Sequence, residues 1–240
     1  MRVAMIHLLV LAVLVSVVPC SRICVAQAPP TIEEELNKYG VPLTLASLRA
    51  ALKDRRAVVR HLAAFELAMM RDTESVPLIV GALEAEKDEN ARFNMAAALV
   101  LLHSQVGNTE LLRFCDDASV REDTRLNAAL RLVEAGDLSC LSSVENILSQ
   151  TSLLSMRIWA LQILRQAKVI PASLLPRVHR SLLASLQDPD SDVRFEASRC
   201  IAAIGDKNAA PSLRTAIGKE SDAQARAQME KALEALERLP

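Results

Sequence analysis

Apolar residues along most of this chain recur three and four positions apart, in segments of helical length separated by polar or proline-containing turns. The stretch DPDSDVRFEASRCIAAIGD, residues 188–206, shows the pattern: a polar turn precedes a helix on which Phe195, Ser198 and Ile201 share one side. A shorter apolar stretch lies ahead of such helices, as in SVPLIVGALEA from residue 75. The pattern predicts a unit of two helices joined by a turn.

One arginine marks the start of the second helix in each unit. Small or apolar residues follow it at the first, fourth and seventh positions in most units, which lie on one side of a helix. Spacings of 32, 33, 32, 37 and 32 residues separate Arg60, Arg92, Arg125, Arg157, Arg194 and Arg226. A single hairpin cannot bury its apolar side, so the repeat predicts an all-α, right-handed solenoid of about six hairpins over residues 42–240. The longer spacing predicts a longer connection or a longer first helix near AKVIPASLLP.

Two of the units align without a gap, one from Ser75 and one from Ala209. Ten of their 28 positions are identical, among them Pro77 with Pro211, Asp88 with Asp222, Arg92 with Arg226, Met95 with Met229 and Leu99 with Leu233. The prolines stand where the first helix begins, a position that requires no amide donor. Asp88, Asp190 and Asp222 precede the arginine by four residues and are predicted to cap the second helix.

The first 26 residues have the form of a secretory signal peptide, with Arg2 ahead of an apolar run and small residues before the expected cleavage site. Cleavage after Ala28 is the alternative site, and an uncleaved anchor is the alternative reading. Residues 27–41 are predicted to be a linker and a capping helix, TIEEELNKYG, which ends at Gly40. These features predict an exported protein, periplasmic or extracellular, without stable membrane insertion after cleavage.

Composition and charge narrow the choice of partner. The chain has one Trp, one Tyr and four Phe, so Leu and Ala must form the core. Removal of residues 1–26 takes away Arg2 and Arg22 and no acidic residue, which changes the formal net charge from −1 to −3. This balance favours neither nucleic acid nor an anionic membrane as a partner.

The stretch DPDSDVRFEASRCIAAIG resembles the HEAT-like repeat found in bilin lyases and many bacterial scaffold proteins, and the resemblance extends over about residues 42–238. It implies that the second helices line the concave face and that the Asp and Arg of the motif bond between neighbouring repeats. We therefore predict that the arginine column is a structural ladder of inter-repeat hydrogen bonds rather than an anion-binding stripe. The ladder is expected to be irregular, because Arg56, Arg121 and Leu153 replace the aspartate in three units.

Residue patterns for known chemistry are missing from the sequence. His61, His103 and His179 lack metal-binding spacing, and no Gly-x-Ser-x-Gly elbow, Gly-rich phosphate loop or Cys-x-x-Cys pair occurs. The sequence predicts no catalytic residue, metal or cofactor. A non-enzymatic scaffold or adaptor that binds another protein through the concave face is therefore the preferred function. A lyase or an accessory subunit acting on a small ligand, as in bilin-lyase-type HEAT proteins, is the alternative.

A candidate partner-binding surface follows from the positions two, six and nine residues after each arginine, which are predicted to be exposed. It consists of Asn94, Asn127, Arg131, Glu134, Trp159, Gln166 and Glu196. An amphipathic aromatic among polar residues has the composition of a binding hot spot. Packing of Trp159 over a gap between two helices is the equally weighted alternative.

Three cysteines remain after the signal segment: Cys115, Cys140 and Cys200. A shift by one repeat places the equivalent of Cys115 at Ile147, seven residues beyond Cys140. Seven helical residues span about 10 Å, which exceeds the roughly 7 Å limit between bridged Cα atoms. The spacing predicts that the chain forms no intramolecular disulfide.

Overall fold

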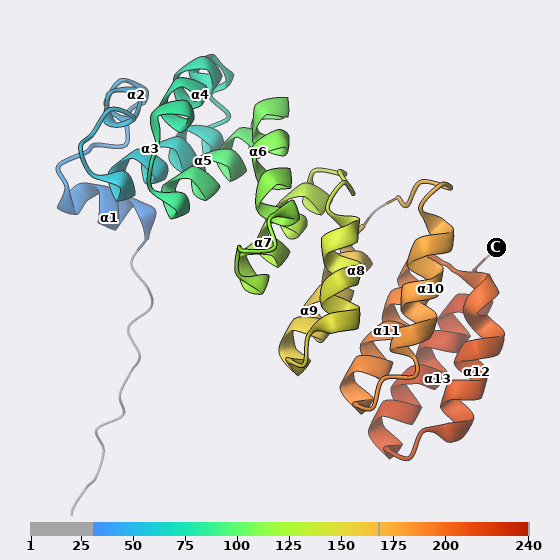
Figure 1. Cartoon of the computed structure of the whole chain (residues 1–240). Helices are drawn as coiled ribbons and strands as arrows, with labels where there is room; N and C mark the ends of the chain where they lie inside the picture. Colours follow the sequence, from blue (N-terminus) through green and yellow to red (C-terminus); the bar gives the residue numbers. More distant parts are fainter. Residues whose placement is uncertain (1–30, 168, 240) are drawn as a thin grey trace, which may run out of the picture. The chain divides into compact units, whose positions relative to one another are not determined.

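The computed structural model describes residues 31–167 and 169–239, which contain thirteen α-helices, two short 3-10 helices and no strand. Figure 1 labels the α-helices in chain order. Their bounds are α1 Ile32–Lys38, α2 Leu45–Ala51, α3 Ala57–Met69, α4 Val76–Ala85, α5 Glu89–Leu101, α6 Gln105–Asp116, α7 Glu122–Glu134, α8 Leu141–Gln150, α9 Leu154–Gln166, α10 Leu175–Ser185, α11 Ser191–Ile204, α12 Ala210–Lys219 and α13 Ala223–Glu237.

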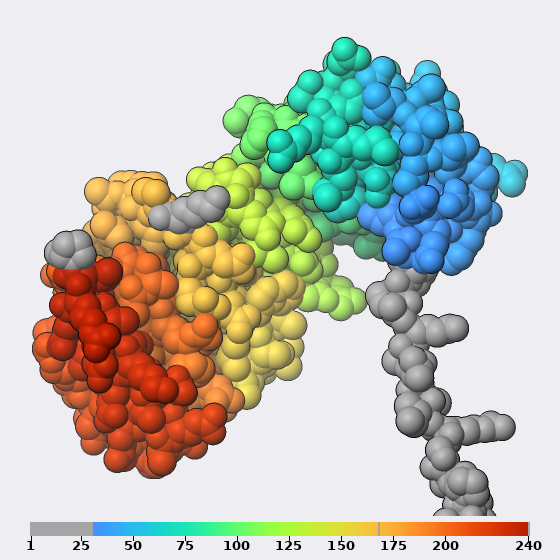
Figure 2. Space-filling model, turned by 180° about the vertical axis from the view of Figure 1, so that it is seen from behind, coloured from blue at the N-terminus to red at the C-terminus, as the bar shows by residue number. Residues whose placement is uncertain are grey.

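After α1, the helices pair into six hairpins, and the predicted all-α solenoid is confirmed. The second helices α3, α5, α7, α9, α11 and α13 each pack on the next to form one layer. The first helices α2, α4, α6, α8, α10 and α12 pack on this layer far more than on one another. In Figure 2 each part of the surface is bordered by parts that neighbour it in sequence, as stacking of successive hairpins requires. Residues from Ile32 onward form one compact unit.

The helix ends follow the repeat. The predicted capping role of Asp88, Asp190 and Asp222 is confirmed, since each side chain accepts a hydrogen bond from a backbone N–H in the first turn of α5, α11 or α13. Four second helices lead into a residue with positive φ, eleven positions after the repeat arginine. These residues are Arg71, His103, Gly136 and Gly205. The left-handed residue ends the helix and turns the chain toward the next hairpin.

Buried Leu and Ala dominate the interior, which divides into two hydrophobic clusters. One cluster extends from α1 to α5 and the other from α5 to α13. Helix α5 contributes to both: Met95 and Leu99 belong to the first cluster, whereas Ala96 and Val100 belong to the second. The two clusters therefore meet across a single helix.

The next helix, α6, crosses α5 at unusually close range. A Cβ added to Gly107 would lie 2.7 Å from the Ala96 oxygen, the Leu99 Cβ and the Val100 nitrogen, so only glycine fits there without displacement of the backbone. This contact draws α6 onto α5.

The prediction of no disulfide was wrong. Cys115 and Cys140 are bonded, with their Cα atoms 5.8 Å apart, and Cys200 is a buried free thiol. The prediction assumed that α6 and α8 run side by side in the register of the repeat. Instead, the C-terminal end of α6 lies beside the first turn of α8, where the Ser143 hydroxyl donates a 2.6 Å hydrogen bond to the Cys115 carbonyl.

The five extra residues between Arg157 and Arg194 lie mostly in two connections: relative to the preceding unit, two are between α9 and α10, two are between α10 and α11, and one is in α10. Helix α10 has eleven residues, against ten for α8 and α12, while eight residues, 167–174, separate α9 from α10. Within this connection Val169 is 78 % exposed.

At the N-terminal end, the predicted signal segment, residues 1–26, lies outside the described residues. The predicted capping helix is α1, which buries Leu36 in the first cluster and is followed by Gly40 at φ 73°. Between residues 31 and 239, leaving out residue 168, no helix is both long and apolar enough to cross a membrane.

We predict that Gly107→Ala lowers the free energy of unfolding by about 1–3 kcal/mol, because the added methyl group must force α5 and α6 apart. Gly81→Ala in α4 is the matched control. Its Cβ meets no atom within 4 Å, so alanine's better helix propensity should raise stability by up to about 1 kcal/mol. Urea denaturation of both variants measures the difference, and equal effects at the two positions would contradict the close crossing.

Candidate functional site

The repeat arginines bind two acceptors each where the ladder is complete. Arg60, near the start of α3, donates from Nη1 to the Asp54 carbonyl at 2.7 Å, and from Nε and Nη2 to the two carboxylate oxygens of Glu86, both at 2.7 Å. Asp54 belongs to the same hairpin as Arg60, whereas Glu86 ends the first helix of the next hairpin. One planar guanidinium therefore fixes its own turn and also binds the neighbouring repeat.

The same geometry recurs near the other end of the array. Arg194 of α11 donates to the Asp188 carbonyl and, with Nε and Nη2 both at 2.7 Å, to the carboxylate of Glu220 after α12. Arg157 of α9 bonds to the Thr151 carbonyl at 3.3 Å and pairs with Asp188 at 2.9 Å. Arg60, Arg157 and Arg194 therefore each join their own turn to the next hairpin, whereas Arg226 bonds, among the described residues, only to the Glu220 carbonyl of its own hairpin.

The acidic partners form a second column that sequence reasoning missed. They stand six residues before each arginine, where the side chain meets the arginine of the preceding hairpin and the carbonyl meets the arginine of its own hairpin. The residues at this position are Asp54, Glu86, Ser119, Thr151, Asp188 and Glu220. Glu86 and Glu220 are identical in the two units that align without a gap, which was the available signal.

Hydrogen bonds from arginine lower the pKa of two buried acids in this column, Glu86 and Glu220. The guanidinium of Arg60 holds the pKa of Glu86 down at about 2, helped by the backbone N–H groups of Asp88 and Lys87, while burial opposes the shift. Arg194 lowers the pKa of Glu220 in the same way. Each carboxylate therefore stays ionised in the interface between hairpins, and its pairing contributes stability above its ordinary pKa that is lost as the pH falls through the lowered value.

The ladder fails in the middle, where Ser119 and Thr151 replace the acid. Arg92 bonds instead to Glu110, which lies within α6 and reaches it because α6 crosses α5 closely. Arg125 of α7 has neither partner: its Nε is buried without a hydrogen bond among the described residues. The Thr151 hydroxyl turns to Glu122, at 2.8 Å.

The disulfide spans the interface at which this pairing is missing. Cys115 belongs to α6 in the third hairpin, and Cys140 is the N-cap of α8 in the fourth. Arg125 and Thr151 face each other's hairpins across the same interface. A covalent bond and the Ser143 hydrogen bond thus join two hairpins that lack the arginine–carboxylate contact.

The predicted partner-binding residues do not form one uniformly exposed surface. Asn94 and Asn127 are half-buried, and each side-chain amide donates to the carbonyl four residues earlier in its own helix. Arg131 and Glu134 pair with each other at 3.0 Å, with both side chains more than 40 % exposed, and Gln166 is exposed at the end of α9. Of the three predicted positions, the ninth after the arginine is exposed in every unit.

Glu196 was wrongly expected to be exposed. It is only 3 % exposed and is held by Arg165 of α9 at 2.9 Å and by Arg199 at 3.0 Å. Two cations draw the carboxylate into the contact between α9 and α11, so it joins neighbouring hairpins instead of facing solvent.

Trp159 combines features of the two alternatives predicted from the sequence, exposure at a binding surface and packing between helices. It is half-buried and packs against the second hydrophobic cluster. Its equivalents two positions after the arginine in α3, α5 and α7 are also half-buried. A tryptophan in this position supports the packing of the core and leaves part of the ring available at the surface.

Titratable groups elsewhere offer little chemistry. His179 Nδ1 lies 2.6 Å from Asp206 Oδ2, beside a hollow of about 590 Å³. Within the part of the chain that the structure describes, His, Cys, Asp and Glu side chains form no group of three able to hold a metal ion.

Comparisons with known families agree with this architecture. A model of HEAT repeats matches residues 155–234, and a model of the PBS lyase HEAT-like repeat matches residues 59–85. The chain therefore contains HEAT-like repeats within these two ranges. Among curated protein sequences, none matches it.

Three solved structures are similar in fold. Human deoxyhypusine hydroxylase in complex with glycerol is 18 % identical, with a TM-score of 0.44 over 85 % of this chain and 88 % of that one. YibA of Escherichia coli is 16 % identical, with a TM-score of 0.41 over 89 % and 99 %. The complex of CpcE and CpcF of phycocyanin lyase from Nostoc sp. is 17 % identical, with a TM-score of 0.40 over 90 % and 98 %. Similarity at this level carries no information about activity.

We predict that Arg194→Met lowers the free energy of unfolding by about 3–5 kcal/mol, because it leaves the fully buried Glu220 carboxylate without its cation. Arg125→Met is the matched control and should cost less than about 1 kcal/mol, because the methionine retains the apolar stem and no carboxylate loses a partner. Chemical denaturation of both variants measures the contrast. Equal costs would show that the carboxylate does not decide the strength of the contact.

Proposed function

We propose that this chain is a non-enzymatic scaffold that is exported and binds another protein through the exposed face of its second-helix layer. The observation that carries the proposal is the column of side chains nine positions after each arginine, which is exposed in all six hairpins. Helices that pack on one another in order present this column as one continuous row, and extended rows of this kind suit a protein partner better than a small molecule.

The chemistry of this row changes along the array. Met69 at the end of α3 is 59 % exposed and Leu101 at the end of α5 is 44 % exposed, so the first hairpins present large apolar side chains. Glu134 and Gln166 occupy the same position in α7 and α9. Exposed Met and Leu beside polar groups favour a partner with an apolar contact region and a polar rim.

The disulfide within the repeat domain supports export. A disulfide persists in an oxidising compartment and is rare in the reducing cytosol. The Cys115–Cys140 bond therefore favours the periplasm or the cell exterior, in line with the signal-like segment at residues 1–26.

Site-specific crosslinking tests the binding face. A photo-reactive residue at Leu101 or Gln166 should capture the same protein from an envelope extract, whereas one at Thr215, exposed on α12 in the first-helix layer, should not. With the captured protein purified, Met69→Glu together with Leu101→Glu should weaken binding by about tenfold or more, which corresponds to one hot-spot contact. Denaturation of the double variant controls for folding.

Other outcomes would overturn the scaffold proposal. Capture of the same protein from Thr215 but not from Leu101 would move the interface to the first-helix layer. A chromophore visible in the absorbance spectrum of the purified protein, in stoichiometric amount, would favour an action on a small ligand.

We predict that the double variant Cys115→Ser, Cys140→Ser lowers the free energy of unfolding by about 3.5 kcal/mol, the chain-entropy contribution of a loop of this length. The expected thiol count of the unfolded, unreduced chain after signal cleavage is one, from Cys200. Titration of three thiols in protein isolated from the envelope would contradict both the bond and the argument for export.

A further inference from the structure

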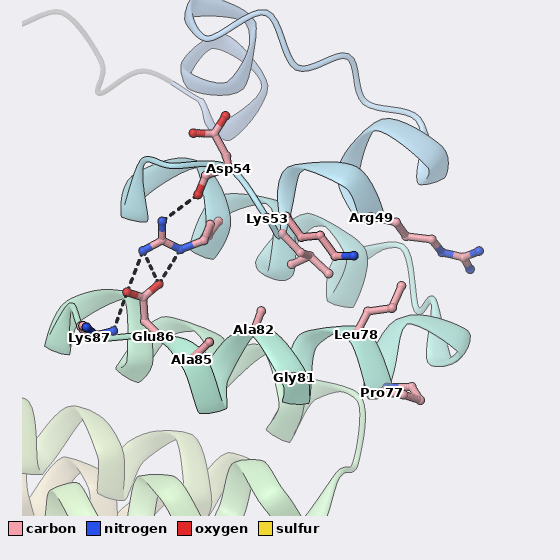
Figure 3. A pocket seen from close by; sticks show the side chains of 12 residues that line it. Arg49, Lys53, Asp54, Pro77, Leu78, Gly81, Ala82, Ala85, Glu86 and Lys87 are labelled. Atoms are coloured by element: carbon pink, nitrogen blue, oxygen red, sulfur yellow. Dashed lines mark hydrogen bonds and ion pairs between the residues drawn. The ribbon is translucent and has the colours of Figure 1, made fainter.

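A groove between α2 and α4 lies on the first-helix layer, away from the row of exposed second-helix residues. Its volume is about 670 Å³. Figure 3 shows Arg49 and Leu78 toward one end of the groove, Glu86 and Lys87 at the other, and Gly81 with Ala82 between them.

Small side chains on α4 create the space. Gly81, Ala82 and Ala85 line the groove, and a Cβ built at Gly81 meets no atom within 4 Å. Leu52 at the end of α2 and Leu78 on α4 are also in the lining, and Leu78 remains 43 % exposed. The groove is therefore open, apolar and wide enough to receive a side chain from outside the molecule.

The charge around the groove is positive. Arg49 pairs with Asp72 at 2.6 Å and with Glu74 at 3.0 Å, Arg60 is bound to Glu86, and the carboxylate of Asp54 is held by Arg56. Lys53 and Lys87 are exposed, and neither ammonium group has an ion-pair partner among residues 31–167 and 169–239. Two unpaired cations thus flank an apolar groove in a chain whose formal net charge is negative.

The protein contains an internal comparison for this groove. Residues 134 positions later occupy the same places in the fifth and sixth hairpins, as Pro77 and Pro211 or α4 and α12 show. Six of the twelve lining residues are unchanged there: Leu52, Asp54, Arg60, Pro77, Ala82 and Glu86. These residues maintain the stacking of the hairpins, so their identity follows from the fold.

The other six lining residues differ in charge or in polarity. The cations Arg49, Lys53 and Lys87 correspond to the uncharged Leu183, Gln187 and Ser221. The apolar residues Leu78, Gly81 and Ala85 correspond to the polar Ser212, Thr215 and Lys219. At these six positions the first two hairpins therefore carry three cations and three apolar residues, whereas the fifth and sixth hairpins carry one cation, Lys219, and are more polar.

We propose that this groove binds a peptide segment of a partner protein in which apolar side chains are flanked by carboxylates. The apolar side chains would contact Leu52, Leu78 and Ala82, and the carboxylates would meet Lys53 and Lys87. A peptide is favoured over a small ligand because six of the twelve lining residues are exposed, whereas small-molecule sites bury most of their ligand. The inference is independent of the scaffold proposal, which concerns the second-helix face.

The test measures fluorescence polarisation of a fluorescein-labelled peptide, Glu-Glu-Leu-Leu-Glu-Glu, with the purified chain. Gly81→Leu places a side chain in the groove, from a position whose Cβ meets no atom within 4 Å, and should weaken binding by at least about tenfold. Gly218→Leu in α12 is the matched control, since its Cβ also meets nothing within 4 Å, and should leave the affinity unchanged. Lys53→Ser with Lys87→Ser should also weaken binding and remove most of its salt dependence.

Several results would overturn the proposal. One is the absence of saturable binding of the acidic peptide. Another is equal binding of Lys-Lys-Leu-Leu-Lys-Lys or Glu-Glu-Ser-Ser-Glu-Glu. A third is an equal effect of the two glycine variants on the affinity for the acidic peptide. Preferential binding of a fluorescent fatty acid, lost in Gly81→Leu, would assign the groove to an anionic amphiphile instead. None of these results depends on the second-helix crosslinks, so failure here leaves the scaffold proposal standing.

Discussion

Stacking in this protein depends on a guanidinium shared between two hairpins. In the complete form, seen at Arg60 and Arg194, the planar group bonds to a carbonyl six residues earlier and to a carboxylate of the next hairpin. The carbonyl fixes the turn of one unit and the carboxylate fixes the position of the next, so one side chain couples local structure to the array. The apolar sides of the helices supply the driving force for burial, whereas this contact sets how one hairpin sits on another.

The contact also explains where the array is irregular. A serine at position 119 and a threonine at position 151 remove the carboxylates of the middle hairpins. Around this gap three other contacts join neighbouring hairpins: the pairing of Arg92 with Glu110 of α6, the close contact at Gly107 and the Cys115–Cys140 bond. All three contacts involve α6, which carries Gly107 and Glu110 and has Cys115 in its last turn. The two hydrophobic clusters meet at the same place, on α5.

The fold was predictable because apolar periodicity and arginine spacing both act locally and repeat. The acidic column could have been predicted from the sequence, but Ser119 and Thr151 interrupt it and made the pattern hard to recognise. The close contact of α6 with α5 could not be predicted, since the lack of space at Gly107 depends on how two helix backbones pack. The repeat spacing likewise placed Cys115 beside Ile147, whereas it is bonded to Cys140 at the start of α8. Glu196 was misplaced because helical periodicity gives the direction of a side chain, while Arg165 on the neighbouring helix determines whether that direction is buried.

The disulfide encloses a particular piece of chain. The 25-residue separation between Cys115 and Cys140 contains the whole of α7, the helix whose Arg125 lacks a carboxylate. A stack of hairpins frays from its two ends, because the terminal units have a neighbour on one side only. Fraying that reaches this ring from either terminus meets a helix tied at both ends. Such a helix can detach only over a short distance and therefore returns quickly to its place. The disulfide ring thus holds the middle of the stack together, and unfolding of the hairpins on one side of it need not spread to the hairpins on the other side.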